Sequence, residues 1–164
     1  MELTSDGLDD HVATIAQLLE RYGVVLDLGA VRELVVDQTP GGSALFELRG
    51  FLPDGRQPAR SVIEVREVWR RRSVEALERW EYEYELLDHE RGFRRAFHLH
   101  DRDEFVRRHQ VVVHEHCERP IGVAPCAHVE GSPVRDAFDG VERLLAAWTD
   151  PSVPDCTRFR CLEP

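Results

Sequence analysis

Histidine is concentrated in one part of this chain, with a spacing suited to chemistry. Six of the eight histidines lie between residues 98 and 128. His98 and His100 stand two apart in one strand-like segment, and His114 and His116 do the same in the next. Residues two apart in a strand project from the same face of a sheet. If the two segments pair as a hairpin, the four imidazoles should lie within side-chain reach of one another.

Two cysteines and another histidine follow the second pair and suggest a metal site. Zinc favours imidazole and thiolate ligands, takes three or four of them, and in catalytic sites keeps one position open for water. Zinc is therefore a candidate cofactor. The candidate ligands are His114, His116, Cys117, Cys126 and His128. In an alternative with four thiolates, Cys156 and Cys161 would complete a structural zinc site with Cys117 and Cys126.

The same histidines also suit acid–base chemistry without a metal. One imidazole can accept a proton near neutral pH while another donates one. Cleavage of RNA by its own 2′-hydroxyl needs such a pair and a cation. Arg94 is an even number of residues from His98 and His100 in the same strand and therefore shares their face, whereas Arg95 does not. The candidate catalytic residues are His98, His100, His114, His116 and Arg94. Nearby aromatic residues suit either base stacking or the core, and core is the commoner role; these are Trp80, Tyr82 and Tyr84.

Each of these assignments has a plainer alternative. The four histidines would then only decorate a polar, solvated sheet face. His11 and His89 fit a surface helix and a turn, and no role is assigned to them. Glu64 and Glu67 suit acid–base chemistry, but solvated carboxylates on a strand are commoner.

The hydrophobic pattern predicts two amphipathic helices and a run of strands. Leu8–Tyr22 has one apolar helical face and ends before Gly23. A second helix is expected near Pro133, with Ser132 as its N-cap and the same apolar spacing through Trp148. Strands are predicted at Ala44–Leu52, Ser61–Arg70, Arg79–Leu87, Phe93–His100 and Gln110–Cys117.

Strands joined by such short turns pair antiparallel as a meander. We therefore expect an α+β fold, in which about five strands form a meander and both helices pack on one face. Residues 1–150 would form a single domain, and residues 151–164 an irregular tail. The apolar residues that alternate with the histidines mark the core side, so the histidine face should be relatively open. These core-side residues are Phe97, Leu99, Val111 and Val113.

The composition limits the classes of function. The 164 residues are 42% hydrophobic and 32% charged, which is typical of a globular protein. No apolar run approaches the roughly 20 residues that a membrane span needs, and Met1–Asp10 lacks the features of a signal peptide. We therefore expect a cytoplasmic protein that has no membrane partner. The net charge of −10 argues against a broad nucleic-acid surface, although residues 56–119 balance fourteen arginines with fourteen acids.

The order of these features between residues 54 and 128 resembles the TumE-type toxins of toxin–antitoxin systems. The resemblance rests on the Asp54-Gly55 turn, the acid-rich strand 62–67, the Tyr82-Glu83-Tyr84 strand and the two histidine segments. It implies an RNA-directed, ribonuclease-like toxin with an antitoxin partner, in which the four strand histidines carry the activity. The alternative is a non-catalytic zinc-binding interaction domain.

Overall fold

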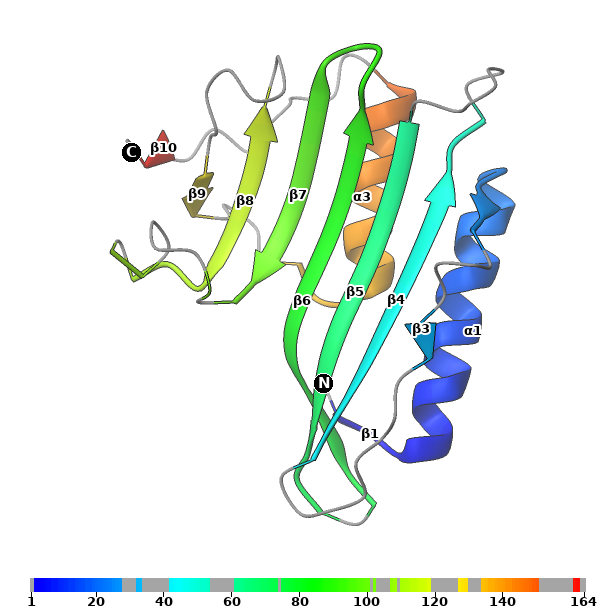
Figure 1. The fold of residues 1–164 in the computed structure, drawn as a ribbon, viewed down its shortest axis with the longest axis vertical. Coiled ribbons are helices and arrows are strands. Elements are labelled where there is room, and N and C mark those ends of the chain that lie inside the picture. The colour runs from blue at the N-terminus through cyan, green and yellow to red at the C-terminus, as the bar shows by residue number, and fades with distance from the viewer. Residues whose placement is uncertain are drawn as a thin grey trace.

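The computed structural model shows an α+β fold in which two helices cover one face of an antiparallel sheet (Figure 1). The structure describes residues 2–27, 32–33, 42–53, 61–73, 75–100, 102, 107–108, 110–118, 127–129, 134–150 and 161–162. In this part of the chain, no helix is long and apolar enough to cross a membrane.

The five long strands form the predicted meander. They are β4 (Ser43–Phe51), β5 (Ser61–Arg71), β6 (Leu77–Asp88), β7 (Phe93–Leu99) and β8 (Val113–Glu118). Each pairs antiparallel with the next. All five therefore confirm the strands expected from the sequence, with small changes at their ends.

Short strands extend the sheet at its margins. They are β1 (Glu2–Leu3), β2 (Val25–Leu26), β3 (Arg32–Glu33), β9 (Ala127–Val129) and β10 (Cys161–Leu162). β1 pairs with β6, β2 and β3 pair with β4, β9 pairs with β8, and β10 pairs with β9. The segment predicted to be an irregular tail thus contributes a two-residue strand.

Helix α1 (Ser5–Arg21) confirms the first predicted helix. Its N-cap residue is Thr4, whose hydroxyl accepts a hydrogen bond from the Gly7 amide at 3.0 Å. Gly23, just beyond the C-terminal end, has a φ of 76°, which glycine adopts without steric cost. The Thr4 cap therefore sets the start of the helix, and Gly23 allows the chain to turn away at its end.

Helix α3 (Ala137–Thr149) begins later than predicted. Its N-cap is Asp136, whose carboxylate accepts from the Asp139 amide at 2.9 Å. The predicted start near Pro133 is wrong because Asp136 supplies this acceptor one turn further on. Ser132 and Pro133 lie outside the described residues.

The hydrophobic core lies between the helices and one face of the sheet. α1 and α3 contact each other, α1 lies against β4, and α3 lies against β6 and β7 (Figure 1). The largest fully buried side chains include Trp69, Tyr84, Phe97, Ile15 and Leu144. This packing confirms that both helices cover the same face.

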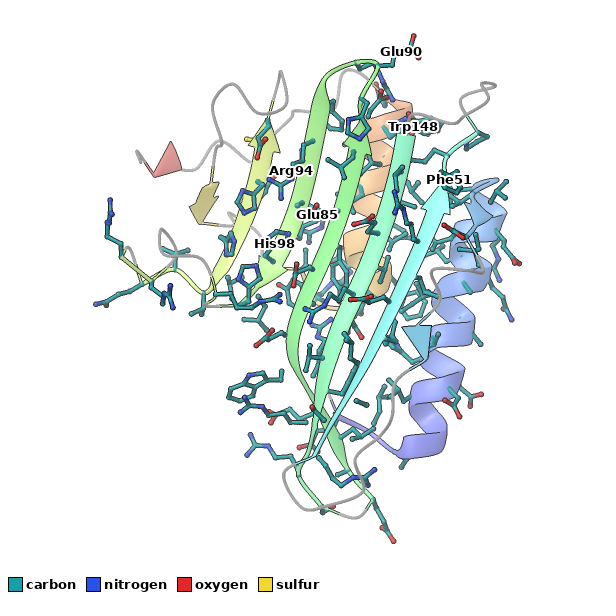
Figure 2. All side chains as sticks on the ribbon, in the orientation of Figure 1. Phe51, Glu85, Glu90, Arg94, His98 and Trp148 are labelled. Atoms are coloured by element: carbon teal, nitrogen blue, oxygen red, sulfur yellow. The ribbon has the colours of Figure 1, made fainter. Side chains whose placement is uncertain are left out.

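The opposite face of the sheet carries a network of ion pairs. Arg66 on β5 bridges Glu47 of β4 at 3.2 Å and Glu83 of β6 at 2.7 Å. Arg94 on β7 contacts Glu85 of β6 at 2.6 Å. Cross-strand charge pairs of this kind stabilise neighbouring strands. In Figure 2, with α3 behind the sheet, Glu85, Arg94 and His98 can be followed along this face.

Candidate metal centre

The register between β7 and β8 brings the two histidine pairs together. His98 lies directly opposite His114, and Ala96 lies opposite His116. The ring centroid of His98 lies 5.2 Å from that of His114, 4.8 Å from that of His116 and 5.0 Å from that of His100. The predicted convergence is confirmed, and we call these four residues the four-histidine cluster.

The four-histidine cluster is buried, although it lies on the face away from the helices. His114 is fully buried, and the exposed fractions of His98, His100 and His116 are 3%, 6% and 8%. The expectation of a relatively open histidine face is therefore wrong. The rings shield one another from solvent because they pack edge-to-face, with His114 at 89° to His98 and 85° to His100. A solvated, purely decorative role does not fit this burial.

Hydrogen bonds orient two of the four rings. Nε2 of His98 lies 2.9 Å from Oε1 of Glu85, and Nδ1 of His114 lies 3.4 Å from the carbonyl oxygen of Val112. Both acceptors are oxygens, so each of these nitrogens carries the proton and donates it. The lone pair is then on Nδ1 of His98 and on Nε2 of His114. Metal-binding histidines are commonly oriented in this way by a carboxylate or a backbone carbonyl.

The other two rings also present ring nitrogens inside the cluster. Nε2 of His100 lies 3.3 Å from Nδ1 of His98. Among the described residues, neither ring nitrogen of His116 has a hydrogen-bond partner. Burial, together with the nearby charge of the Arg94 guanidinium, lowers the pKa of His116 to about 2. His116 is therefore a neutral imidazole at physiological pH, the form that binds metals.

Two overlapping sets of side chains could hold a metal ion. His98, His114 and His116 each offer a ligand atom within 4.8 Å of the others, and so do Glu83, His98 and His100. His98 belongs to both sets. Three imidazoles match the ligand set of catalytic zinc sites.

The predicted set of five metal ligands is not brought together. Cys117 pairs with Arg95 and therefore points to the helix side of the sheet, away from His114 and His116. The register places His128 opposite Glu115, and the side chain of His128 lies outside the described residues. Cys126 lies outside the described residues, as do Cys156 and the side chain of Cys161. The inclusion of Cys117 is wrong because it is one residue out of phase with the histidines.

Arg94 lies on the histidine face as predicted, but two carboxylates hold it. Its guanidinium donates to Glu85 and to Glu118, both at 2.6 Å. Burial tends to raise the pKa of Glu85, but the hydrogen bond from His98 and the charge of Arg94 prevail and lower it to about 2. Glu85 is therefore an ionised partner that fixes both His98 and Arg94.

A pocket of about 280 Å³ adjoins the four-histidine cluster. Its lining residues are Glu83, Glu85, Arg94, His98, His100 and Arg102. Arg102, just beyond β7, forms ion pairs with Glu81 and Glu83. The pocket thus offers carboxylates and guanidinium groups next to two of the four imidazoles.

A second buried polar network lies on the helix side and was missed. Glu67 is fully buried, and its carboxylate accepts from His11, Trp69, Arg79 and Tyr84. His11, which was expected at the surface, is only 7% exposed. Its spacing from Leu8 and Ile15 already placed it on the apolar face of α1. The alternation of Val65, Glu67 and Trp69 likewise placed Glu67 towards the core.

The three aromatic residues that the sequence placed near the histidines divide between core and surface. Tyr82 and Tyr84 are buried and stack on each other with ring centroids 4.8 Å apart. Trp80 remains 42% exposed. The two tyrosines are therefore core residues and are not accessible to bases.

Comparison of the chain with protein-family models, curated proteins and solved structures finds no match. The assignment of function therefore rests on the site itself.

Proposed function

We propose that this protein is a zinc-dependent hydrolase whose metal ligands are His98, His114 and His116. The observation that carries this proposal is the convergence of three imidazoles, each offering a nitrogen within 4.8 Å of the others. For Zn–N bonds of about 2.0–2.1 Å, tetrahedral geometry puts ligand nitrogens about 3.3–3.4 Å apart. Small rotations of the three rings would close the remaining distance.

The protonation pattern supports three neutral nitrogen ligands. Glu85 holds the proton of His98 on Nε2, and the Val112 carbonyl holds that of His114 on Nδ1. His114 keeps this hydrogen bond when its Nε2 faces a cation, whereas Nδ1 of His98 would exchange the hydrogen bond from Nε2 of His100 for the cation. The ring nitrogens of buried His116 find no hydrogen-bond partner in the described part of the chain, and a buried polar atom without a hydrogen bond is costly because it has lost its solvation.

The adjoining pocket supports a catalytic role in preference to a structural one. A catalytic zinc ion supplies a Lewis acid and keeps one coordination position open. His100 and Glu83 line the pocket beside His98 and can accept a proton. The hydrophobic core lies on the other face and does not depend on the cluster for its packing. A structural zinc-binding domain, the alternative, would make folding depend on the metal.

Zinc titration of protein purified without a histidine tag tests this proposal. We expect one zinc ion per chain and an affinity lowered by at least about 100-fold in His116→Gln, with the glutamine variant still folded by circular dichroism. His89→Gln is the matched control, because His89 lies exposed in the turn between β6 and β7. Cys117→Ser should also bind zinc normally. An untagged wild type that binds no zinc, or His116→Gln binding like His89→Gln, would contradict the metal site.

The hydrolytic role has its own assay. Zinc-loaded protein should hydrolyse an activated ester such as p-nitrophenyl acetate, and His116→Gln should abolish this activity while His89→Gln retains it. Glu83→Gln should keep the zinc and lower the rate. Normal zinc binding without hydrolysis would rule out this part of the proposal and favour the structural zinc domain.

The RNA-directed toxin activity, its antitoxin partner and the cytoplasmic location stay predictions. The cation expected to stabilise the transition state, Arg94, is already engaged by Glu85 and Glu118. The toxin interpretation predicts that expression slows growth and that His114→Ala relieves the effect. Normal growth on expression of the wild type would remove its main support.

A further inference from the structure

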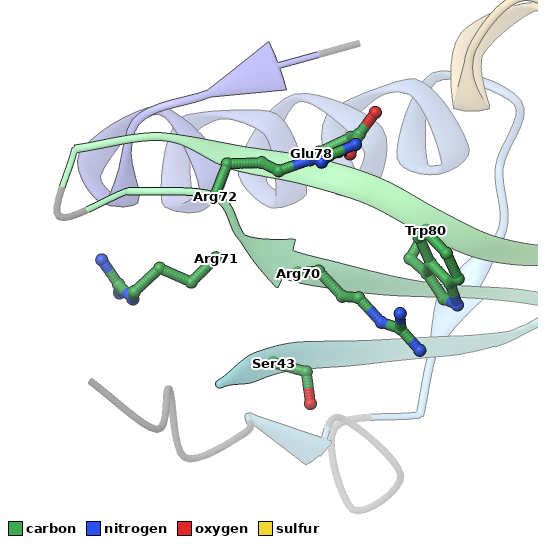
Figure 3. A pocket seen from close by; sticks show the side chains of 6 residues that line it. All are labelled: Ser43, Arg70, Arg71, Arg72, Glu78 and Trp80. Carbon is green, nitrogen blue, oxygen red and sulfur yellow. Dashed lines mark hydrogen bonds and ion pairs between the residues drawn. The ribbon is translucent and has the colours of Figure 1, made fainter. Parts of the chain in front are cut away.

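A pocket at the other end of the meander is unrelated to the histidines. It lies where β4 begins, β5 ends and β6 begins, and has a volume of about 410 Å³ (Figure 3). Its lining residues are Ser43, Arg70, Arg71, Arg72, Glu78 and Trp80. The lining thus contains three arginines and one carboxylate, in a chain whose net charge is −10. The pocket is a local positive site on an otherwise acidic protein.

A β-bulge explains why a tryptophan is exposed here. The register between β5 and β6 shifts between Val68 and Trp69, so that Val68 pairs with Glu81 and Trp69 with Arg79. Trp80 is the extra residue. Bulges re-aim side chains and occur frequently beside functional sites. Trp69 is fully buried, whereas Trp80 is 42% exposed at the pocket.

The guanidinium of Arg70 lies over this exposed ring. Its guanidinium carbon lies 3.5 Å from the centroid of Trp80 (Figure 3). Among the described residues Arg70 makes no ion pair, in contrast to Arg72, which is bound to Glu78. A guanidinium over an aromatic ring is held there by cation–π attraction. A planar fork of N–H donors is well matched to the oxygens of a phosphate.

Ser43 adds a hydroxyl to the same place. It lies directly opposite Arg70 in the register between β4 and β5 and is exposed. A hydroxyl can donate to one phosphate oxygen while the guanidinium donates to two others. The pocket therefore combines a bidentate cation, a neutral donor and an exposed aromatic surface.

We propose that this pocket binds the 5′-phosphate of a nucleotide, with the base stacked on the part of the Trp80 ring that stays exposed beside Arg70. Arg70 and Ser43 would contact the phosphate oxygens, and Arg71 adds positive charge to the lining, whereas the charge of Arg72 is balanced by Glu78. Stacking on an aromatic side chain tolerates any base, since every base has a π-face. The site is independent of the metal centre. It suits either a free mononucleotide or the phosphorylated end of a single strand.

Fluorescence titration with the four nucleoside 5′-monophosphates tests the proposal. We expect quenching of Trp80, absent in Trp80→Phe, and binding weakened by about tenfold or more when adenosine or inorganic phosphate replaces AMP. Arg70→Gln should weaken AMP binding by a similar factor. Arg49→Gln is the matched control, because Arg49 is an exposed arginine on the same sheet that pairs with Glu64. It should bind AMP like the wild type.

A 5′-phosphorylated tetranucleotide distinguishes the two sources of ligand. Binding tighter than that of AMP identifies a strand end, and weaker binding identifies the free nucleotide. Two results would overturn the proposal: no binding of any monophosphate at millimolar concentration, or equal loss in Arg70→Gln and Arg49→Gln. Neither depends on whether zinc is bound.

Discussion

Replacing Glu67 by glutamine tests how strongly the helix face depends on one buried charge. The carboxylate is fully buried and accepts from His11 at 2.9 Å, from Trp69 at 3.0 Å and from Arg79 at 3.3 Å, as well as from the hydroxyl of Tyr84. The glutamine side chain has an NH₂ group in place of one carboxylate oxygen. This group cannot accept hydrogen bonds, so it would face the donors of the network with N–H groups of its own. It would also leave the Arg79 guanidinium, only 8% exposed at its side chain, without its counter-charge.

The magnitude follows from the burial of this ion pair. Removing one partner of a buried pair costs about 3–5 kcal/mol, since the other charge stays desolvated. With a urea dependence of about 2 kcal/mol per molar, Glu67→Gln should lower the midpoint by roughly 1.5–2.5 M. Urea unfolding followed by circular dichroism measures this change.

Glu64 provides a matched control on the same strand. It lies three residues earlier, faces the opposite side, and pairs with Arg49 at 3.3 Å with both side chains over 40% exposed. Glu64→Gln should therefore cost only about 0–1 kcal/mol. The reasoning is refuted if the two variants unfold at the same urea concentration.

Two further predictions concern packing and pH. Gly140→Ala would put a methyl carbon 2.5 Å from a ring carbon of Tyr84, so we expect a loss of about 1–3 kcal/mol on thermal unfolding; an unchanged melting temperature would contradict this. Burial tends to raise the pKa of Asp88, but hydrogen bonds from Arg91 prevail and lower it below its ordinary 3.8. Its contribution to stability is therefore present above pH 3.8 and lost as the pH falls through the lower, folded value. Asp88→Asn should be less stable than the wild type at pH 6, with a difference that shrinks below pH 3.8; a constant difference would contradict the shift.

Periodicity predicted the fold well because each long element has one apolar face. The meander followed from alternation and short turns, and helix α1 from the spacing of Leu8, Ile15 and Leu19. The start of α3 did not follow, because Ser132 and Asp136 are both good N-caps. Which one caps depends on where the helix meets the sheet, and local sequence does not contain that information.

The candidate site was predicted in its geometry but not in its environment. Parity alone placed His98, His114 and His116 on one face, and it should also have excluded Cys117. Burial could not be predicted in this way, because it depends on how rings on different strands pack together. Glu67 is the opposite case, because its place between Val65 and Trp69 did indicate burial, whereas its donors from α1 and β6 lie far away in sequence.

The two buried polar networks differ in a way that separates structure from function. Glu67 has two oxygens and four donors, so the helix-side network is satisfied by the protein alone. In the four-histidine cluster, Nδ1 of His98 accepts from Nε2 of His100 at 3.3 Å, whereas His116 has two buried nitrogens without hydrogen bonds among the described residues. Neutral imidazoles present one lone pair each, and only a donor or a cation can satisfy it. A shared metal ion would satisfy the lone pair of His116, and this unmet acceptor is why we propose a metal site on the histidine face and not at Glu67.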